Sequence, residues 1–266
     1  MQVNSRASGP HGSRMRIEHL YRYPVKGLTA EALDAVALDA GGTLPWDRAF
    51  ALAQGGAPFD PAAPRWLAKT HFMCLMANAR AALLRASFDA ASGLLLIRGP
   101  DGAELRASPL TEAGRAELGT WLAAFLGAEA RGTPRFHHVP GHSFSDLRSK
   151  VVSVINLGSV ADLARRAGAP RHHLRFRANL YLSGAPAWSE LDWVGQDLMA
   201  GGARLRVVKR IPRCAATEVN PETAARDAHP VAELRAAFGH HDLGVYAEVI
   251  EGGEVAVGDA VELLPA

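Results

Sequence analysis

Residues 80–107 read RAALLRASFDAASGLLLIRGPDGAELRA, and this stretch decides the class of fold. Short apolar segments predict a hairpin of strands at 80–88 and 93–98 and a further strand at 103–107, joined by turns rich in glycine, proline and aspartate. Short strands with tight turns form a curled sheet or a small barrel rather than a βαβ unit. The stretch therefore predicts a small β-barrel-like lobe in the first part of the chain.

The pattern continues outward in both directions. Further strands are predicted at 16–23, 31–39, 48–54, 151–155, 176–182, 203–208, 244–250 and 259–264. A helix is expected from an N-cap at Ser108, with Pro109 at its first position, to Gly127. A second helix is expected to begin with a capping box at Ser159 and to end near Gly168, and a third to cover 231–238.

These elements predict a mainly β protein with short helices, an α+β fold of two lobes. The expected order is a disordered tail (1–14), a small β-barrel-like lobe (15–107), a helix with a polar crossing segment (108–150) and a second β-barrel lobe (151–264). The change from hairpins to a helix and then to a polar crossing indicates that the two lobes share a cleft.

Composition excludes several classes of protein. The chain has 266 residues, 48% of them hydrophobic, and a formal charge of +2, without the clustered basic faces of a nucleic-acid-binding protein. Its densest apolar run, Leu94–Ile97, is far short of the roughly 18 residues of a membrane helix. Two cysteines fit a reducing cytoplasm. We therefore expect a cytoplasmic protein with no nucleic-acid or membrane partner, and the sequence assigns no oligomeric state.

The two cysteines have different surroundings. Cys214 ends KRIPRC (209–214), where neighbouring cations favour the thiolate that attacks electrophiles or binds soft metals. A buried, inert cysteine remains an equal alternative at this point. Cys74 lies among apolar residues in HFMCLMANA (71–79) and is expected to pack in the core.

Other motifs with a defined chemistry are absent. The sequence has no GxGxxG, GxxxxGK[ST] or GxSxG motif. Its three His-His pairs, at 137–138, 172–173 and 240–241, predict solvated or capping side chains, because adjacent residues point apart and make poor metal ligand sets. Basic residues stand singly beside turns or short strands at Lys26, Arg48, Arg175, Arg177 and Arg213. An anion site would need several such side chains to converge from different loops.

Six segments in order resemble one known family. They are YPVKGL (23–28), WDRAFAL (46–52), RFRANLYLSG (175–184), ELDW (190–193), RCAATEVNPET (213–223) and LGVYAEVIEGGEVAVGD (243–259). In them the chain resembles the MOSC (molybdenum-cofactor sulfurase C-terminal) superfamily with its preceding N-terminal β-barrel domain. The resemblance covers about residues 16–264. It implies a molybdenum-cofactor cleft between the lobes.

The resemblance also implies roles for particular residues. Cys214 corresponds to the cysteine that ligates molybdenum or carries persulfide sulfur. The other residues implied to bind the cofactor are Lys26, Arg48, Asn156, Ser159, Arg177, Asn179 and Arg213. For Asn156 and Ser159, simple helix capping is an equal alternative, and Arg213 either orients the cofactor or tunes the thiolate. Lys26 and Arg48 are expected to face Cys214 across the cleft, and Arg48→Ala to lower cofactor occupancy with the fold intact.

The chain also departs from the family pattern. Gly27 stands where amidoxime-reducing relatives usually have serine, and Ala178 replaces the proline of FRPN. Two cysteines cannot supply the four thiolates of an appended [2Fe–2S] domain. Electrons are therefore expected from a separate donor protein of ferredoxin or flavoprotein type. Pyridoxal phosphate is not expected to bind this chain alone.

The function implied is that of an enzyme, a molybdenum-dependent oxidoreductase that converts a small N-hydroxylated substrate from N–OH to N–H. Two alternatives stay open. One is a sulfurtransferase or sulfur carrier that uses a Cys214 persulfide, and the other is a non-catalytic protein that binds or delivers the cofactor.

Overall fold

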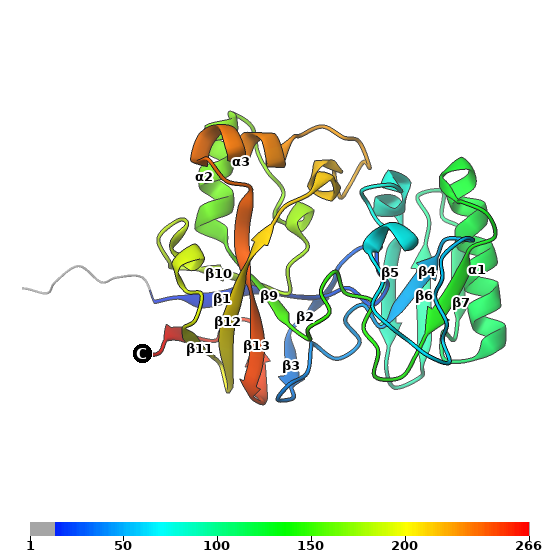
Figure 1. Ribbon diagram of the computed structural model, residues 1–266, viewed down its shortest axis with the longest axis horizontal. Coiled ribbons are helices and arrows are strands. Elements are labelled where there is room, and N and C mark those ends of the chain that lie inside the picture. The colour runs from blue at the N-terminus through cyan, green and yellow to red at the C-terminus, as the bar shows by residue number, and fades with distance from the viewer. Residues whose placement is uncertain (1–13, 266) are drawn as a thin grey trace, which may run out of the picture.

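The structure is a computed structural model that describes residues 14–265. Apart from Arg14, the predicted tail at 1–14 lies outside the described residues. Two lobes stand side by side: a large lobe with β1–β3 and β9–β15, and a small lobe with β4–β8 and α1 (Figure 1). The predicted mainly β, two-lobed fold is confirmed.

An eight-stranded sheet forms the large lobe, in the order β15-β11-β12-β13-β9-β10-β1-β2. The strands are β1 (Arg16–Arg22), β2 (Glu31–Leu33), β9 (Val152–Asn156), β10 (Leu180–Ser183), β11 (Asp197–Ala200), β12 (Ala203–Pro212), β13 (Asp242–Glu251) and β15 (Val261–Leu263). The sheet curls until the start of β1 meets the chain before β15, where Ile17 N donates to Asp259 O (3.0 Å) and Val261 N to Met15 O (2.9 Å). These bonds close it into a barrel-like lobe.

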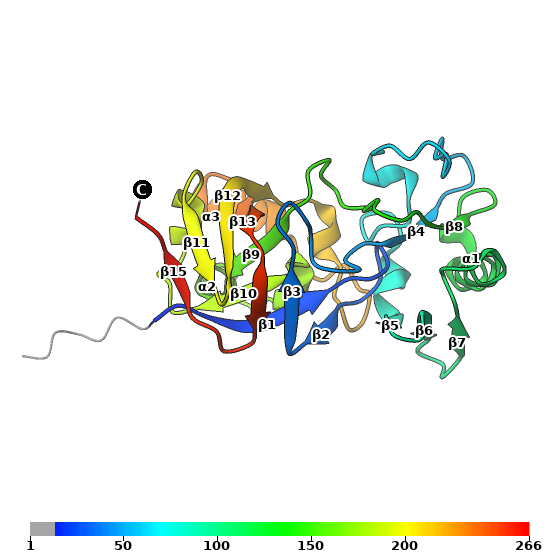
Figure 2. The same cartoon turned by 90° about the horizontal axis from the view of Figure 1, so that it is seen from below.

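The first three strands belong to this large lobe. β1 pairs antiparallel with β10, and β3 (Ala35–Leu38) pairs with β14 (Gly253–Ala256). Figure 2 shows β1–β3 beside the C-terminal strands. The range 15–107, expected to form the first lobe, is therefore divided between the two lobes. The reason is non-local: Ile17 and Leu20 of β1 pack in one core with Val154 and Val245.

The small lobe contains two sheets and one helix. Its elements are β4 (Phe50–Ala53), β5 (Arg85–Asp89), β6 (Leu94–Arg98), β7 (Glu104–Ala107), α1 (Glu112–Leu126) and β8 (Arg135–His138). β5 alternates exposed and buried positions, as its sequence predicts, and buries Phe88. β8 lies within the predicted crossing segment because Phe136 is buried and its strand pairs with β4. Residues Ala79–Leu83, expected to begin a strand, form a 3-10 helix instead.

Two helices begin at caps other than those predicted. Thr111 caps α1, where its Oγ1 accepts from Gly114 N (3.1 Å), whereas the Ser108 hydroxyl donates to Gly93 O (2.9 Å). Asn156 caps α2 (Leu157–Ala167) through a bond from Gly158 N (2.9 Å), so Ser159 lies inside this helix. The predicted helix ends at Gly127 and Gly168 are confirmed.

The third helix and the short 3-10 helices complete the fold. α3 (Pro230–Phe238) packs against α2 on the large lobe (Figure 1). The remaining 3-10 helices cover Lys69–His71, Gly127–Glu129, His173–Phe176, Ser189–Asp192 and Ala215–Glu218. Among residues 14–265, no helix combines the length and the apolarity needed to cross a bilayer.

Candidate active site

A cavity of about 150 Å³ lies between the two lobes. The sequence-predicted residues on its wall are Lys26, Arg48, Arg177, Asn179, Arg213 and Cys214. Lys26 lies in the turn between β1 and β2, and Arg48 lies two residues before β4 of the small lobe. Cys214 follows β12 of the large lobe. The folded chain therefore brings together six of the eight residues that the sequence singled out, across about 190 positions.

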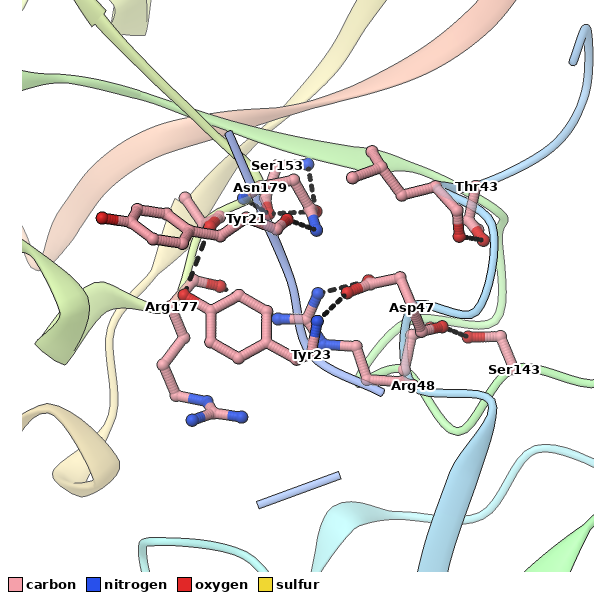
Figure 3. Close-up of polar contacts among 12 residues, drawn as sticks. Tyr21, Tyr23, Thr43, Asp47, Arg48, Ser143, Ser153, Arg177 and Asn179 are labelled. Atoms are coloured by element: carbon pink, nitrogen blue, oxygen red, sulfur yellow. Dashed lines mark hydrogen bonds and ion pairs between the residues drawn. The ribbon is translucent and has the colours of Figure 1, made fainter. Parts of the chain in front are cut away.

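Tyr23 is buried between Arg48 and Arg177, two residues of the cavity wall (Figure 3). The guanidinium carbons of Arg48 and Arg177 each lie 4.4 Å from its ring centroid, within the range of cation–π attraction. Arg48 pairs with Asp47 and donates to Arg177 O (2.9 Å), and Asp47 accepts from Tyr23 N (2.8 Å). Arg48 and Arg177 both have left-handed backbone, with φ of 51° and 53°.

Burial and neighbouring charges have opposite effects on the pKa values of Arg48 and Tyr23. Burial lowers the pKa of the Arg48 guanidinium, but Asp47 and Tyr23 outweigh it, and the net pKa is raised. Burial raises the pKa of Tyr23 to about 12, against the opposing effect of Arg177 and Arg48. Arg48 therefore keeps its positive charge and Tyr23 its proton. The wall presents fixed cations to the cavity.

Lys26 projects from the turn that follows β1. Its ammonium donates to Phe144 O (2.8 Å) and pairs with Asp146 of the crossing segment. Burial lowers the pKa of Lys26, and Asp146 opposes this shift. The next residue, Gly27, has φ +86°, and a Cβ atom there would lie 2.9 Å from Met73 O. A side chain at this position would be strained, so the turn favours glycine.

Cys214 lies where β12 ends and the 3-10 helix Ala215–Glu218 begins. Lys69 of the small lobe donates from Nζ to Cys214 Sγ at 3.1 Å and lies 3.8 Å from Asp146. Burial lowers the pKa of Lys69, but the contacts with Cys214 and Asp146 outweigh burial, so the pKa is raised overall. Cys74 is buried, as predicted, and also lies on the cavity wall.

Lys69 and Asp146 were missed by the sequence reasoning. Lys69 follows the apolar residues of RWLAK (65–69), and Asp146 is one polar residue in a polar segment. Burial favours protonation of Asp146, but Lys26 and Lys69 outweigh it and lower its pKa. No local signal could have found the two residues, because neither lies near Cys214 in sequence.

Arg213 and Asn179 have their polar groups largely committed to the protein. Arg213 donates to Leu243 O and Phe176 O, both at 2.8 Å through Nε and Nη1, and burial lowers its pKa. Asn179 is 2% exposed; its Oδ1 accepts from Ser153 Oγ (2.7 Å) and its amide donates to Tyr21 O (3.2 Å) (Figure 3). Asn179 thus joins three strands beneath the cavity.

Asn156 and Ser159 do not line the cavity. The Asn156 amide donates to Pro186 O (2.7 Å), and the Ser159 hydroxyl donates to Glu190 Oε2 (2.8 Å). Glu190 is fully buried, and burial raises its pKa. Asn156 therefore caps α2, as the capping alternative has it, whereas Ser159 lies inside the helix and belongs to a buried polar cluster.

Fold and site together define a two-lobed β protein with a cationic, thiol-bearing cavity between its lobes. The family model for the MOSC N-terminal beta barrel domain matches residues 14–129, and that for the MOSC domain matches residues 134–262. The chain belongs to the MOSC family, with both domains in this order. This membership associates it with the molybdenum cofactor.

A curated relative and solved structures are also similar to the chain. The chain is 27% identical over 122 residues to mitochondrial amidoxime reducing component 2 of Bos taurus, a match that covers 41% of this chain and 36% of the relative. The chain thus spans about a third of that relative's length. The YuaD protein of Bacillus subtilis is similar over 94% of both chains, with a TM-score of 0.45 and 17% identity. YiiM of Geobacillus stearothermophilus is similar over 43% of this chain and 54% of its own, with a TM-score of 0.34 and 19% identity.

Proposed function

We propose that the protein binds the molybdenum cofactor in the cavity between its lobes, with Cys214 as the protein ligand of the metal. The observation that carries this proposal is the position of Cys214 Sγ on a cavity wall that also bears Lys26, Arg48 and Arg177. A thiolate is a soft ligand suited to a metal that also takes sulfur ligands from a pterin dithiolene. The surrounding cations suit the phosphate of the same cofactor.

The residues of the cavity fit such a group. Arg177 commits one guanidinium nitrogen, Nη1, to Leu28 O (2.7 Å). Lys26 and Arg48 are held in place by Asp146 and Asp47, so their positions are set before an anion arrives. Each charge-assisted hydrogen bond to a phosphate is worth about 1.5–3 kcal/mol net. Binding therefore uses side chains that are already ordered, which lowers its entropic cost.

The proposed reaction is the reduction of a small N-hydroxylated substrate to the corresponding N–H compound. It consumes two electrons and two protons and releases the hydroxyl oxygen as water. When bound, the molybdenum centre would supply the two-electron chemistry. A separate donor protein of ferredoxin or flavoprotein type would supply the electrons, and the cytoplasm is the proposed location. The name of the bovine relative supports this substrate class.

A second candidate is sulfur transfer through a Cys214 persulfide. The contact of Lys69 Nζ with Cys214 Sγ at 3.1 Å favours it, because an ammonium beside the sulfur would stabilise an anionic persulfide. The same contact suits a metal-bound thiolate. The two candidates therefore differ in what the purified protein carries.

Metal and pterin analysis tests the proposal on protein made in a host that synthesises molybdenum cofactor. We expect molybdenum and pterin in near-equal amounts with the wild-type chain, and turnover of an amidoxime with an artificial reductant. Cys214→Ser should lose the metal and at least ~100-fold of the activity, since loss of a metal ligand should cost no less than changes to the groups that support such ligands. Cys74→Ser is the matched control and should retain the metal at a cost of ~1–3 kcal/mol in stability.

Other outcomes have defined meanings. Cyanide-labile sulfur on Cys214 without molybdenum would replace the proposal by sulfur transfer. Bound molybdenum and pterin without turnover of any N-hydroxylated compound would make the chain a cofactor-binding or delivery protein.

A further inference from the structure

We propose that Lys69 is a positioning residue for Cys214, a small-lobe ammonium that orients the sulfur and makes its surroundings attractive to anions. The inference rests on the proposed function in one respect, that Cys214 is the functional sulfur. It adds a residue that belongs to none of the family-like segments and lies 145 positions from Cys214.

The backbone that carries Lys69 is fixed within the small lobe. Lys69–His71 is a 3-10 helix whose carbonyls are held from two sides. His71 O accepts from Gln54 N (2.8 Å), and Thr70 O accepts from Arg131 Nη2 (2.6 Å). The next residue, Phe72, is buried in an aromatic cluster. The ammonium therefore reaches the sulfur from a rigid base.

Cys214 is fixed equally well from the large lobe. Its carbonyl accepts from Thr217 N (3.0 Å) and Thr217 Oγ1 (2.9 Å), and the preceding Arg213 N donates to His241 O (2.8 Å). The Cys214 side chain can still rotate about its Cα–Cβ bond. The hydrogen bond from Lys69 Nζ selects one direction for Sγ, since a donor at 3.1 Å is available in only part of that rotation.

The charges around the contact favour Lys69 over Lys26 for this role. Lys26 is committed to Phe144 O and Asp146, and its side chain is 7% exposed. The Lys69 side chain is 29% exposed and lies at 3.8 Å from Asp146, a longer ion pair. Lys69 can therefore keep its hydrogen bond to Cys214 Sγ while part of its side chain remains accessible to an anion.

The consequence can be measured by chemical modification of Cys214 without any cofactor. Iodoacetate and iodoacetamide react with the same sulfur and differ in the negative charge of the reagent. A lysine ammonium a few ångströms away favours the anionic reagent by a factor that Coulomb's law puts at about three- to tenfold for a partly exposed site. The ratio of the two rates at one pH therefore reports the local charge at Sγ.

The experiment uses the full chain, purified without cofactor, with alkylation followed by peptide mass spectrometry so that Cys214 and Cys74 are counted separately. Lys69→Met should lower the iodoacetate-to-iodoacetamide ratio at Cys214 by about three- to tenfold. Lys69→Arg should restore most of the ratio, because it returns the charge. Lys209→Met is the matched control: it removes an equal charge from an exposed position five residues before Cys214 and should leave the ratio unchanged.

An unchanged ratio in folded Lys69→Met, or an equal fall in Lys209→Met, would overturn the inference. If Lys69→Met does not fold, Lys69→Gln replaces it, since glutamine keeps an N–H donor without the charge and should also lower the ratio. Molybdenum analysis separates the two proposals. A wild-type chain that never acquires molybdenum refutes the proposed function alone. Molybdenum in the wild-type chain, together with an alkylation ratio of the cofactor-free protein that does not change in Lys69→Met, refutes this inference alone.

Discussion

Breaking the buried Asp47–Arg48 pair should be among the most destabilising single changes to a polar contact of the protein. The two side chains of the pair are 5% and 17% exposed, and Arg48 also donates to Arg177 O. Arg48→Met leaves the Asp47 carboxylate buried without its partner. Removing one partner of a buried pair costs about 3–5 kcal/mol, which is a large share of the roughly 5–15 kcal/mol that holds a typical protein folded. The expectation that Arg48→Ala leaves the fold intact is therefore at risk, and occupancy should be measured on folded protein.

Urea unfolding of four chains measures this coupling: wild type, Asp47→Asn, Arg48→Met and the double variant. In Asp47→Asn the side-chain amide oxygen would still accept from Tyr23 N, so this single variant removes mainly the charge. The double variant should be more stable than the sum of the single losses predicts by at least ~2 kcal/mol, because it leaves no unpaired charge. Arg98→Met, at the exposed pair with Glu104, is the control and should cost no more than about 1 kcal/mol. Additivity within about 0.5 kcal/mol at Asp47 and Arg48 would refute the reasoning.

Two further predictions concern pH and backbone shape. Burial, with His19 and His172 nearby, lowers the pKa of His173 to about 4, against about 6.5 unfolded. The unfolded chain then binds more protons between these values, so stability should fall as pH drops from about 6.5 to 4. At pH 5 the loss should be about 1 kcal/mol after allowance for half exposure, and His173→Gln should flatten the pH profile of unfolding. Gly27→Ala should destabilise by about 2 kcal/mol in the same unfolding assay, because φ is +86° and the new Cβ meets Met73 O; an unchanged midpoint would contradict the turn argument.

Local patterns in the sequence predicted much of the fold. The apolar segments at 93–98 and 103–107 predicted strands where the structure has β6 and β7, and one face of each strand is buried in the small-lobe core. Glycine at 127 and 168 marked two helix ends correctly, since a cap with positive φ is a local requirement. The caps at the other ends of these two helices were each misplaced by three residues. Ser108 and Ser159 were suitable by type, but each hydroxyl bonds a distant group instead.

Contacts between distant segments could not be predicted this way. Nothing local in RIEHLYR (16–22) says that its strand will pair with residues 180–183. Family-like segments placed Lys26 and Cys214 in one site, and the structure has both on the wall of one cavity. Lys69 and Asp146 complete the polar surroundings of Cys214 because the two lobes pack together. The sequence around each of the two residues gives no sign of this contact.

The division of β1–β3 and β9–β15 around the small lobe has a consequence for how the chain folds. Leu38 and Val152 bracket about 110 residues, so direct closure of the large sheet is entropically slow. β4 and β8 pair with each other and hold the two ends of the small lobe side by side. If this lobe forms first, since it is synthesised before β9–β15, the loop left to close shrinks to about 25 flexible residues, which saves about 1 kcal/mol. The folded small lobe would then bring β3 and β9 close together and so promote formation of the large sheet. Slowing the folding of the small lobe should therefore delay formation of the cavity.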